Sequence, residues 1–520
     1  MAIGRSTDIS TFKGGARALR ADRIGLPGLL FSVVAASAPL MVVAGVMPTT
    51  WAVMGIVGQP LIFVILGVVL ALFSVGYAEM SRHVHNAGAF YAYIARGLGG
   101  TAGSAASFLA LLSYSALQFA PYGLLGFEVS TQLQARFDVS VSWWVPAVVG
   151  VLLVGTLGWL KIDLNAKVLG LLLLIEVAIV VVFDISAIAD PAQAGVSFHA
   201  FNPSTLSGAG LGAALCFCIA GFVGFEQSAV YAEETSRPHL VVARVTFLAV
   251  GFIAVFYALG AWALSIAAGP DQVVGLSQKH ATDLLFVLAQ DRLGAGFADV
   301  LHVFFVTGMF ACLLSFHNVV ARYAFAMGRE RLLPAAFGRT NPTSGAPAYG
   351  SLLQSAVSLA AVLLFAVTDK GPVGDPTAPV LRLFTWGGQV GALGIIVLLA
   401  TASVAVIAFF VRRGAARAQA VRIACSALAA AALLVIIFIT VRDFDVLLGS
   451  DPNSPLLWIL PGIVGATAVI GLAYGLYLRA ARPEVHSGIG MGNEVYQIEQ
   501  ARNAGAGAEA GAGAGAGSVS

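Results

Sequence analysis

Charged residues are scarce in this sequence. Only 10% of its 520 residues are Asp, Glu, Lys or Arg, against about 25% in a typical soluble domain. A water-soluble fold of this length could not cover its surface with so few charges. The apolar residues make up 58% of the chain and gather in long runs, and runs of about 18 or more such residues are typical of membrane-spanning helices. We therefore expect an integral membrane protein whose surroundings are the lipid bilayer, with no nucleic-acid partner.

Reactive and metal-binding motifs are also missing. The four cysteines lie inside apolar runs, with no His or further Cys at metal-ligand spacing, so we interpret them as packing residues. The sequence contains no HExxH, no GxSxG and no P-loop with its lysine. We expect no catalytic residue, no metal site and no cofactor, and we do not expect an enzyme. The cysteines are Cys216, Cys218, Cys312 and Cys425.

The long apolar runs predict an all-α polytopic membrane protein with about twelve transmembrane helices. Strands of a membrane barrel would be shorter and alternating, so they are excluded. The transporter domain covers residues 25–482, between a basic segment at 1–24 and a disordered Gly/Ala-rich tail at 483–520. No cleavable signal peptide is evident. The predicted spans are 25–47, 52–77, 103–133, 143–160, 168–188, 209–231, 241–267, 299–325, 348–367, 382–410, 423–441 and 455–478.

Lys and Arg predict the orientation of these spans. If the N-terminus is cytoplasmic, 22 of the 28 Lys and Arg residues fall on the inner side and 6 on the outer side. Cytoplasmic loops carry the excess of positive charge, so we expect both termini in the cytoplasm of a multi-pass protein in the cell membrane. We also expect a short helix across the outer mouth within 270–298, and an amphipathic interfacial stretch within 84–100.

Two of the predicted spans are interrupted. Pro39 lies about halfway along span 1, where it removes the helical partner of the Ala35 carbonyl. In span 6, Gly221 and Gly224 precede Glu226 and weaken the helix near mid-membrane. Paired interruptions at corresponding positions are the best pointer in a sequence to a transporter's binding site. The ends of half-helices present N–H groups suited to a carboxylate and carbonyls suited to an ammonium group. The alternative is a simple proline kink together with close-packing glycines.

The chain resembles the amino acid–polyamine–organocation (APC) superfamily, in its bacterial amino acid permease type. The resemblance runs from about Gly25 to Arg482 and rests on the order and spacing of several short elements. Many members carry a glycine-rich break in span 1, whereas this chain does not. The elements are Ala36-Ser37-Ala38-Pro39-Leu40, Asn86-Ala87-Gly88-Ala89-Phe90-Tyr91, Gly224-Phe225-Glu226, Glu233-Glu234, Arg237-Pro238, Arg322-Tyr323 and Gly328-Arg329.

The resemblance implies a LeuT-like 5+5 inverted repeat plus two C-terminal helices. The first repeat would cover about 25–188, the second about 209–410, and the extra helices about 423–478. It also implies transport of amino acids or related amines, with the substrate held at the two breaks. The predicted substrate-binding residues are Ala36, Ser37, Ala38, Pro39, Ala220, Gly221, Phe222, Val223, Gly224 and Phe225.

Ionisable residues inside the spans suggest a coupling site. Glu176 lies about 13 Å beyond Lys167 at 1.5 Å per helical residue, near the bilayer midplane. A carboxylate there should face the bundle interior, and we predict a proton-coupling role, with a structural role as the alternative. Glu226 is a gating or structural residue. Glu128 and Asp184 are expected to be solvated near outer span ends. His302 and His317 in span 8 are expected to be structural.

We therefore predict a secondary active transporter that moves amino acids or related amines by alternating access. Coupling is expected to be to protons or to exchange of a second substrate, and we favour protons over sodium. One alternative is a transporter-like sensor, although a sizeable soluble output domain is missing from the sequence. The other is a polytopic membrane enzyme, which the missing catalytic motifs disfavour.

Overall fold

The computed structural model describes residues 25–84, 86–160, 166–192, 195–235, 238–341, 345–368, 380–448 and 454–492. The regular structure of these residues is helical, and ten helical stretches among them are long and apolar enough to cross a membrane. Two shorter apolar helices, Trp144–Leu160 and Leu211–Ala220, stand at the remaining two predicted positions. The described part of the chain thus holds the twelve predicted crossings. The basic segment 1–24 lies outside the described residues.

The spans are built mainly from single helices, and four are composite. In order they are α1 (Leu26–Ser37), α2 (Pro39–Met41), η1 (Val42–Val46) and α3 (Met47–Met54) as span 1; α4 (Gln59–Met80); α6 (Gly100–Phe119) with α7 (Pro121–Phe137); α8 (Trp144–Leu160); α9 (Ala166–Ala189); α10 (Leu211–Ala220) with α11 (Gln227–Val230); α12 (Pro238–Ala268); α15 (Ala295–Arg329); α16 (Ala348–Thr368); α17 (Thr385–Arg412) after η6 (Val380–Phe384); α18 (Ala420–Arg442); and α20 (Leu456–Ala481).

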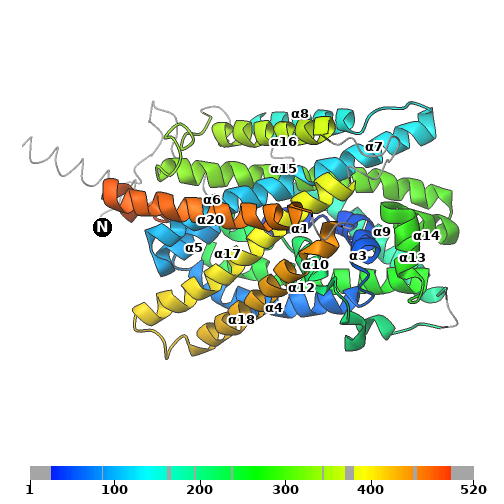
Figure 1. The fold of residues 1–520 in the computed structure, drawn as a ribbon, viewed down its shortest axis with the longest axis horizontal. Helices are drawn as coiled ribbons and strands as arrows, with labels where there is room; N and C mark the ends of the chain where they lie inside the picture. Colours follow the sequence, from blue (N-terminus) through cyan, green and yellow to red (C-terminus); the bar gives the residue numbers. More distant parts are fainter. Residues whose placement is uncertain are drawn as a thin grey trace, which may run out of the picture.

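Short helices mark the two ends of the bundle. The α5 face carries α5 (Ala89–Leu98), η4 (Ala232–Glu234) and α21 (Pro483–Gly488), and the α14 face carries α13 (Val273–His280), η5 (Ala281–Asp283) and α14 (Leu284–Leu293). Figure 1 shows α5 at one end of the long axis and α13 and α14 at the other. The segment 270–298 is helical, as predicted, but it forms two short α-helices joined by a 3₁₀ turn where one helix was expected. The remaining short elements are η2 (His199–Phe201), η3 (Pro203–Leu206) and α19 (Phe444–Leu448).

The packing of the spans relates two halves of five. Spans 2 and 7 pack together as α4 on α12, spans 3 and 8 as α6 on α15, and spans 4 and 9 as α8 on α16. In addition, α1 packs on α9 as α10 packs on α17. The contacts therefore stay the same when spans 1–5 and spans 6–10 are exchanged with each other. Because five is odd, the second half enters the bilayer from the opposite side, which makes the repeat inverted. The extra helices α18 and α20 pack on α4 and α6.

Span 1 is longer than predicted. It continues to Met54 instead of ending at residue 47, and span 2 begins at Gln59 instead of residue 52. Pro48 lies in the first turn of α3, directly after the π-helical turn η1, where a missing N–H is tolerated. The span ends instead at Gly55, which has φ +68 and closes the helix in the left-handed conformation that glycine adopts readily.

Two peripheral segments also differ from expectation. The stretch within 84–100 forms α5, but Phe90, Tyr91 and Ile94 are fully buried against the protein instead of lying on the bilayer surface. The disordered tail was expected from residue 483, whereas 483–488 form α21 and Ile489 is buried. Both segments pack onto α6, which offers apolar surface that a reading of local composition does not reveal.

Candidate functional site

The break in span 1 is a single left-handed residue. Helix α1 ends at Ser37, Ala38 has φ 45 and ψ 72, and α2 begins at Pro39. A residue other than glycine in this conformation costs about 1–2 kcal/mol, so the surrounding packing must stabilise it. The Ala35 carbonyl, which has no helical partner because residue 39 is proline, accepts a hydrogen bond from the Ala38 N–H at 3.2 Å.

Neighbouring spans bind the carbonyls that the break exposes. The Tyr257 hydroxyl on α12 donates to the Ser37 carbonyl at 2.8 Å. The Cys312 thiol on α15 lies 3.2 Å from the Ala36 carbonyl and donates to it. Buried backbone groups need such partners in a membrane, so spans 7 and 8 stabilise the interruption in span 1.

The break in span 6 is a run of turns over residues 221–226. Its hydrogen bonds join residues three apart, as in Gly221 N–H to the Cys218 carbonyl at 3.1 Å. Gly224 has φ +135, and a Cβ atom there would lie 2.9 Å from the Val33 carbonyl oxygen and 3.0 Å from the Ala36 Cβ. A Cβ atom at Gly221 would lie 3.2 Å from a methyl group of Val42. The glycines therefore let the two breaks touch each other.

Glu226 closes the span 6 break from within. The side chain is fully buried; Oε2 accepts the Gly224 N–H at 3.0 Å and Oε1 accepts the Tyr114 hydroxyl at 2.6 Å. The Tyr77 hydroxyl donates to its backbone carbonyl at 3.0 Å. Glu226 thus satisfies the interrupted backbone and links span 6 to spans 2 and 3. Its carboxylate binds an N–H inside the break.

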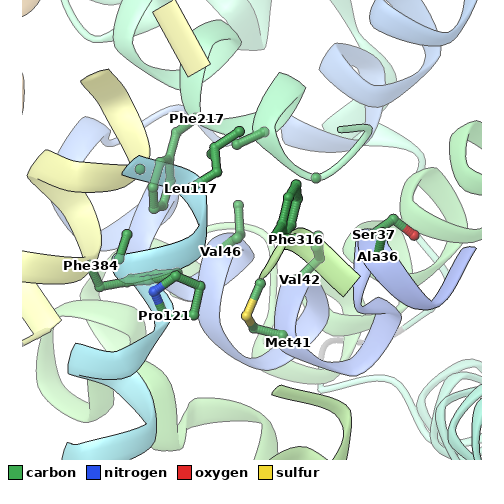
Figure 2. Close-up of a pocket in the computed structure, with 14 residues that line it drawn as sticks. Ala36, Ser37, Met41, Val42, Val46, Leu117, Pro121, Phe217, Phe316 and Phe384 are labelled. Carbon is green, nitrogen blue, oxygen red and sulfur yellow. The ribbon is translucent and has the colours of Figure 1, made fainter. Parts of the chain in front are cut away.

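A cavity of about 30 Å³ lies beside the two breaks. Figure 2 shows its lining, which comes from spans 1, 3, 6, 8 and 10 and is almost wholly apolar, with Ser37 as the polar side chain. The Ser37 hydroxyl donates to the Val34 carbonyl at 2.7 Å. The lining residues are Ala36, Ser37, Met41, Val42, Val46, Leu117, Ala120, Pro121, Phe217, Ala220, Gly221, Phe316, Phe384 and Gly388.

Four of the ten predicted substrate-binding residues line this cavity, namely Ala36, Ser37, Ala220 and Gly221. Ala38, Pro39, Val223 and Gly224 belong to the breaks but not to the lining. The other two predicted residues pack away from the cavity. Phe222 packs on Phe63 and Phe225 packs on Phe73, with ring centroids 6.1 and 6.0 Å apart.

Sequence reasoning missed the lining residues of spans 3, 8 and 10, among them Leu117, Phe316 and Phe384. The aromatic residues it named for substrate binding were Phe222 and Phe225. Phe217 could have been found, because it lies one helical turn before Gly221. No local signal distinguishes Leu117, Phe316 and Phe384 from the many other apolar residues of similar size.

Glu176 lies behind the span 1 break. Its side chain is 3% exposed, so it faces the bundle interior, and its carboxylate lies near the Leu40 N–H. Leu40 is in the first turn of α2, where free N–H groups and the helix dipole favour an anion. Glu176 therefore places a carboxylate at the half-helix N-terminus that the sequence analysis associated with substrate.

Ion pairs and buried tyrosines fill the region between the breaks and the α5 face. Arg322 binds Glu234 at 2.7 Å and Arg329 binds Glu233 at 2.6 Å, which tie the end of span 8 to η4. These four residues belong to the short elements that carry the family resemblance. Four fully buried tyrosines lie in contact between Glu226, α5 and α15; they are Tyr77, Tyr93, Tyr114 and Tyr323.

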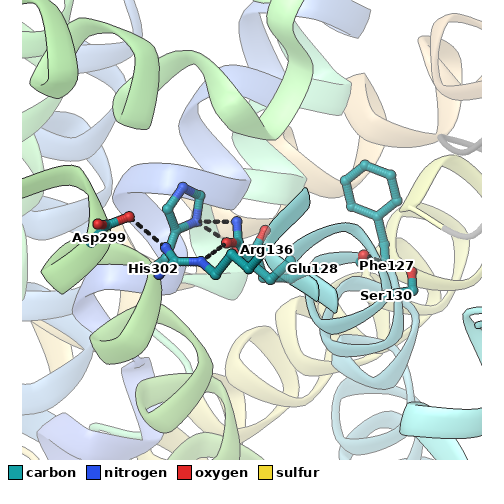
Figure 3. Close-up of polar contacts among 7 residues, drawn as sticks. Phe127, Glu128, Ser130, Arg136, Asp299 and His302 are labelled. Carbon is teal, nitrogen blue, oxygen red and sulfur yellow. Dashed lines mark hydrogen bonds and ion pairs between the residues drawn. The ribbon is translucent and has the colours of Figure 1, made fainter. Parts of the chain in front are cut away.

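Polar residues join spans 3 and 8 toward the α14 face. Figure 3 shows His302 beside Glu128, with Nδ1 2.6 Å from Oε1, and Arg136 beside Asp299 at 2.6 Å. The expectation that Glu128 and Asp184 are solvated is wrong, since they are 1% and 9% exposed. Their helices pack against neighbours near the α14 face. On span 8, His317 accepts or donates a hydrogen bond at 2.7 Å with the Ser351 hydroxyl, a structural contact.

Two solved structures of mutants of the Eremococcus coleocola manganese transporter resemble the chain at 12% identity, covering 90% of this chain and 97% of theirs, with TM-scores of 0.49. No curated protein matches the sequence. Among the described residues, no group of three or more His, Cys, Asp or Glu side chains could hold a metal ion. The sequence profile described as amino acid permease matches residues 29–467. The chain therefore belongs to the amino acid permease family and is a multi-pass membrane transporter.

Proposed function

We propose that this protein moves amino acids or related amines across the cytoplasmic membrane by alternating access. The observation that carries the proposal is the contact between the two broken spans beside one cavity, with Gly224 against Ala36 and Gly221 against Val42. Backbone at membrane depth departs from helix only where protein or a cavity receives it. Two such departures at corresponding positions of an inverted repeat favour a substrate site.

The proposed orientation places the α5 face in the cytoplasm. Arg96 is in the last turn of α5, Arg82 follows the end of α4, and Arg412 on the same face donates to the Gly97 carbonyl at 2.8 Å. An excess of Lys and Arg belongs on the cytoplasmic side. The ion pairs of Glu233 and Glu234 then form an inner gate, and the contacts of Glu128 and Arg136 belong to the outer side.

Substrate recognition would be divided between backbone and apolar side chains. The cavity is apolar apart from Ser37, so it suits the hydrocarbon part of a substrate. The charged groups of the substrate would bind the polar backbone of the two breaks. A cavity of about 30 Å³ is smaller than an amino acid and has room for about one water molecule. Phe217, Phe316 or Phe384 must therefore move when a substrate enters.

Glu176 suggests how proton uptake would be coupled to binding. Its carboxylate competes with a substrate carboxylate for the Leu40 N–H. Protonation removes the negative charge and weakens that contact, because hydrogen bonds to charged groups are the stronger ones. A proton on Glu176 and a substrate carboxylate at α2 would then enter together. An amine without a carboxylate would leave Glu176 at Leu40 in place, which gives exchange or uncoupled transport.

The decisive experiment is uptake into proteoliposomes with an imposed pH gradient. Matched pairs of an amino acid and the amine formed by its decarboxylation, such as phenylalanine and phenethylamine, differ only in the carboxylate. Accumulation of the amino acid alone, driven by inward protons, supports the competition at Leu40. Accumulation of both supports recognition of the ammonium group alone. If no amino acid or amine is accumulated, exchanged or bound in a thermal-shift screen, the proposed function is wrong.

A further inference from the structure

The last described residues fold back onto the α5 face. Helix α20 ends at Ala481, Arg482 has φ −142 and ψ 67, and α21 turns the chain toward α6. The Thr101 hydroxyl lies 3.0 Å from the His486 Nε2. After α21, Ile489 is 4% exposed and its Cγ2 approaches the position of a Cβ at Gly103 to 3.1 Å. This return buries apolar surface on α6.

The turn at 490–492 binds one buried carboxylate. Glu330 follows the end of α15 and is 4% exposed. Its Oε2 accepts the Gly490 N–H at 2.9 Å, and its Oε1 accepts the Gly492 N–H at 2.9 Å. The Asn86 amide donates to the same Oε1 at 2.8 Å, and the Asn86 Oδ1 accepts the Gly88 N–H at 2.9 Å. Successive backbone N–H groups of this kind form an anion-binding concavity.

The two glycines are required by both conformation and space. Gly490 and Gly492 have φ +80 and +56, which residues with a Cβ rarely adopt. A Cβ at Gly490 would lie 2.7 Å from the Ala95 Cβ on α5. A Cβ at Gly492 would lie 2.9 Å from the Asn86 side chain and 3.1 Å from Arg329 Nη2. The alternating glycines therefore fit this one surface closely.

The geometry points to a peptide-binding site on the α5 face, formed by Asn86, Ala95, Gly103 and Glu330, whose ligand is the glycine-rich segment 488–492 of the same chain. The ligand chemistry is a left-handed turn that offers two N–H groups to a carboxylate and one apolar side chain, Ile489, to α6. Recognition by this site does not depend on the identity of the transported substrate.

Docking at this site is connected to the closure of the α5 face. Glu330 is adjacent to Arg329, which binds Glu233 at 2.6 Å. Glu233 also accepts the Ala87 N–H at 3.0 Å. One network thus joins the docked segment, the start of α5, the end of span 8 and η4. An undocked segment leaves the Glu330 carboxylate without two of its donors and exposes it to water, which weakens this network. Docking therefore favours the state in which the α5 face is closed.

Hydrogen–deuterium exchange of the full-length protein tests the site. In Glu330→Gln, and separately in Gly492→Ala, the amides of 488–492 should exchange at least about tenfold faster. The amide side chain offers one acceptor oxygen instead of two, which leaves one of the two glycine N–H groups without its partner, and the added methyl group at 492 meets the Asn86 side chain. Glu484→Gln is the charge control, because Glu484 is exposed on α21. Gly414→Ala is the backbone control, because Gly414 has φ +68 and nothing within 4 Å of its Cβ position.

A synthetic peptide of residues 483–492 supplies the second measurement. Added to the Gly492→Ala protein, it should restore slow exchange in α5, and the same peptide carrying Gly492→Ala should not. Unchanged exchange in core helices α4 and α12 verifies that the variants fold. The proposal is overturned if Glu330→Gln and Gly492→Ala exchange like wild type at 488–492. It is also overturned if the wild-type peptide has no effect on α5, because the segment is then no ligand of a separable site.

Discussion

Glu176 on α9 lies directly against Gly308 on α15. A Cβ atom at residue 308 would be 2.7 Å from Oε1 and 2.9 Å from Oε2 of the carboxylate, which is closer than real Cβ contacts. The missing side chain at Gly308 thus makes the room that the carboxylate occupies near the Leu40 N–H. This contact connects spans 5 and 8 to the break of span 1, and it provides the sharpest tests of the proposed coupling.

Replacing Glu176 by Gln should separate binding from coupling. The amide mimics the protonated acid, so substrate binding should persist while accumulation driven by a pH gradient is lost. Exchange at equal pH should survive. Uptake into proteoliposomes over a range of pH measures this, with Asp184→Asn on the same helix as the control. Sodium-dependent uptake by the wild type, or an unaltered pH profile in Glu176→Gln, would return Glu176 to a structural role.

Gly308→Ala should destabilise the protein by about 1–3 kcal/mol, the usual cost of overpacking. The methyl group would push the Glu176 carboxylate away from Leu40, and the pH dependence of uptake should change with it. In a Glu176→Ala background the same substitution should cost much less, because the clashing atoms are gone. Thermal unfolding of the four proteins in a double-mutant cycle gives the coupling. Additive effects would mean that the two residues do not interact.

Gly221→Leu should block the cavity. A Cβ at this position already lies 3.2 Å from Val42 and 3.3 Å from Tyr257, so the larger side chain must enter the cavity. We expect affinity for a substrate to fall roughly 10- to 100-fold, the equivalent of an overpacking cost of about 1–3 kcal/mol. Gly251→Leu is the matched control, since nothing lies within 4 Å of its Cβ position. Normal substrate binding by Gly221→Leu in thermal-shift titrations would place the site elsewhere.

Reporter fusions test the proposed orientation. Fusions after Arg412, at the end of α17, and after Arg482, beyond α20, should both report the cytoplasm. Both positions lie on the side that receives most Lys and Arg, and such residues resist transfer across the membrane. A fusion after Asp283 on the α14 face should report the outside. A periplasmic signal at either of the first two positions contradicts the predicted topology.

Acidification should strengthen docking of segment 488–492. Burial raises the pKa of Glu330 above its ordinary value of 4.5, although its hydrogen bonds and Arg329 lower it in part. Tyr91 and Glu233 are the other titratable groups near this site. Because the undocked carboxyl group is hydrated, the docked state binds its proton more tightly. The resulting stabilisation is complete below the ordinary pKa and is lost as the pH rises through the raised value.

Exchange rates of the amides of 488–492, corrected for intrinsic pH dependence, measure this effect. Protection should decrease from about pH 5 to pH 8 in the wild type and stay constant in Glu330→Gln. Protection that increases with pH in the wild type would contradict this prediction. It would mean that docking lowers the pKa of Glu330, because the three donors favour the charged carboxylate.

The sequence determined the features that arise within a single segment. Apolar runs fixed the number of crossings, because a helix must pair its own backbone groups in lipid. Pro39 and the glycines of span 6 fixed the two breaks, because they remove a hydrogen-bond donor and weaken the helix locally. Span 1 continues beyond its predicted end because Pro48 follows a π-helical turn and lies in the first turn of α3. A proline in that position does not interrupt the helix.

Only the tertiary structure decided which residues meet across segments. Phe316 and Phe384 are indistinguishable in sequence from other apolar residues of their spans, and they line the cavity because packing brings spans 8 and 10 beside the breaks. Glu128 is buried, instead of solvated, because His302 approaches it from another span. Glu330 binds Gly490 and Gly492 across 160 or more residues of chain. Such contacts depend on side-chain geometry over long sequence separation, and local periodicity carries no information about that geometry.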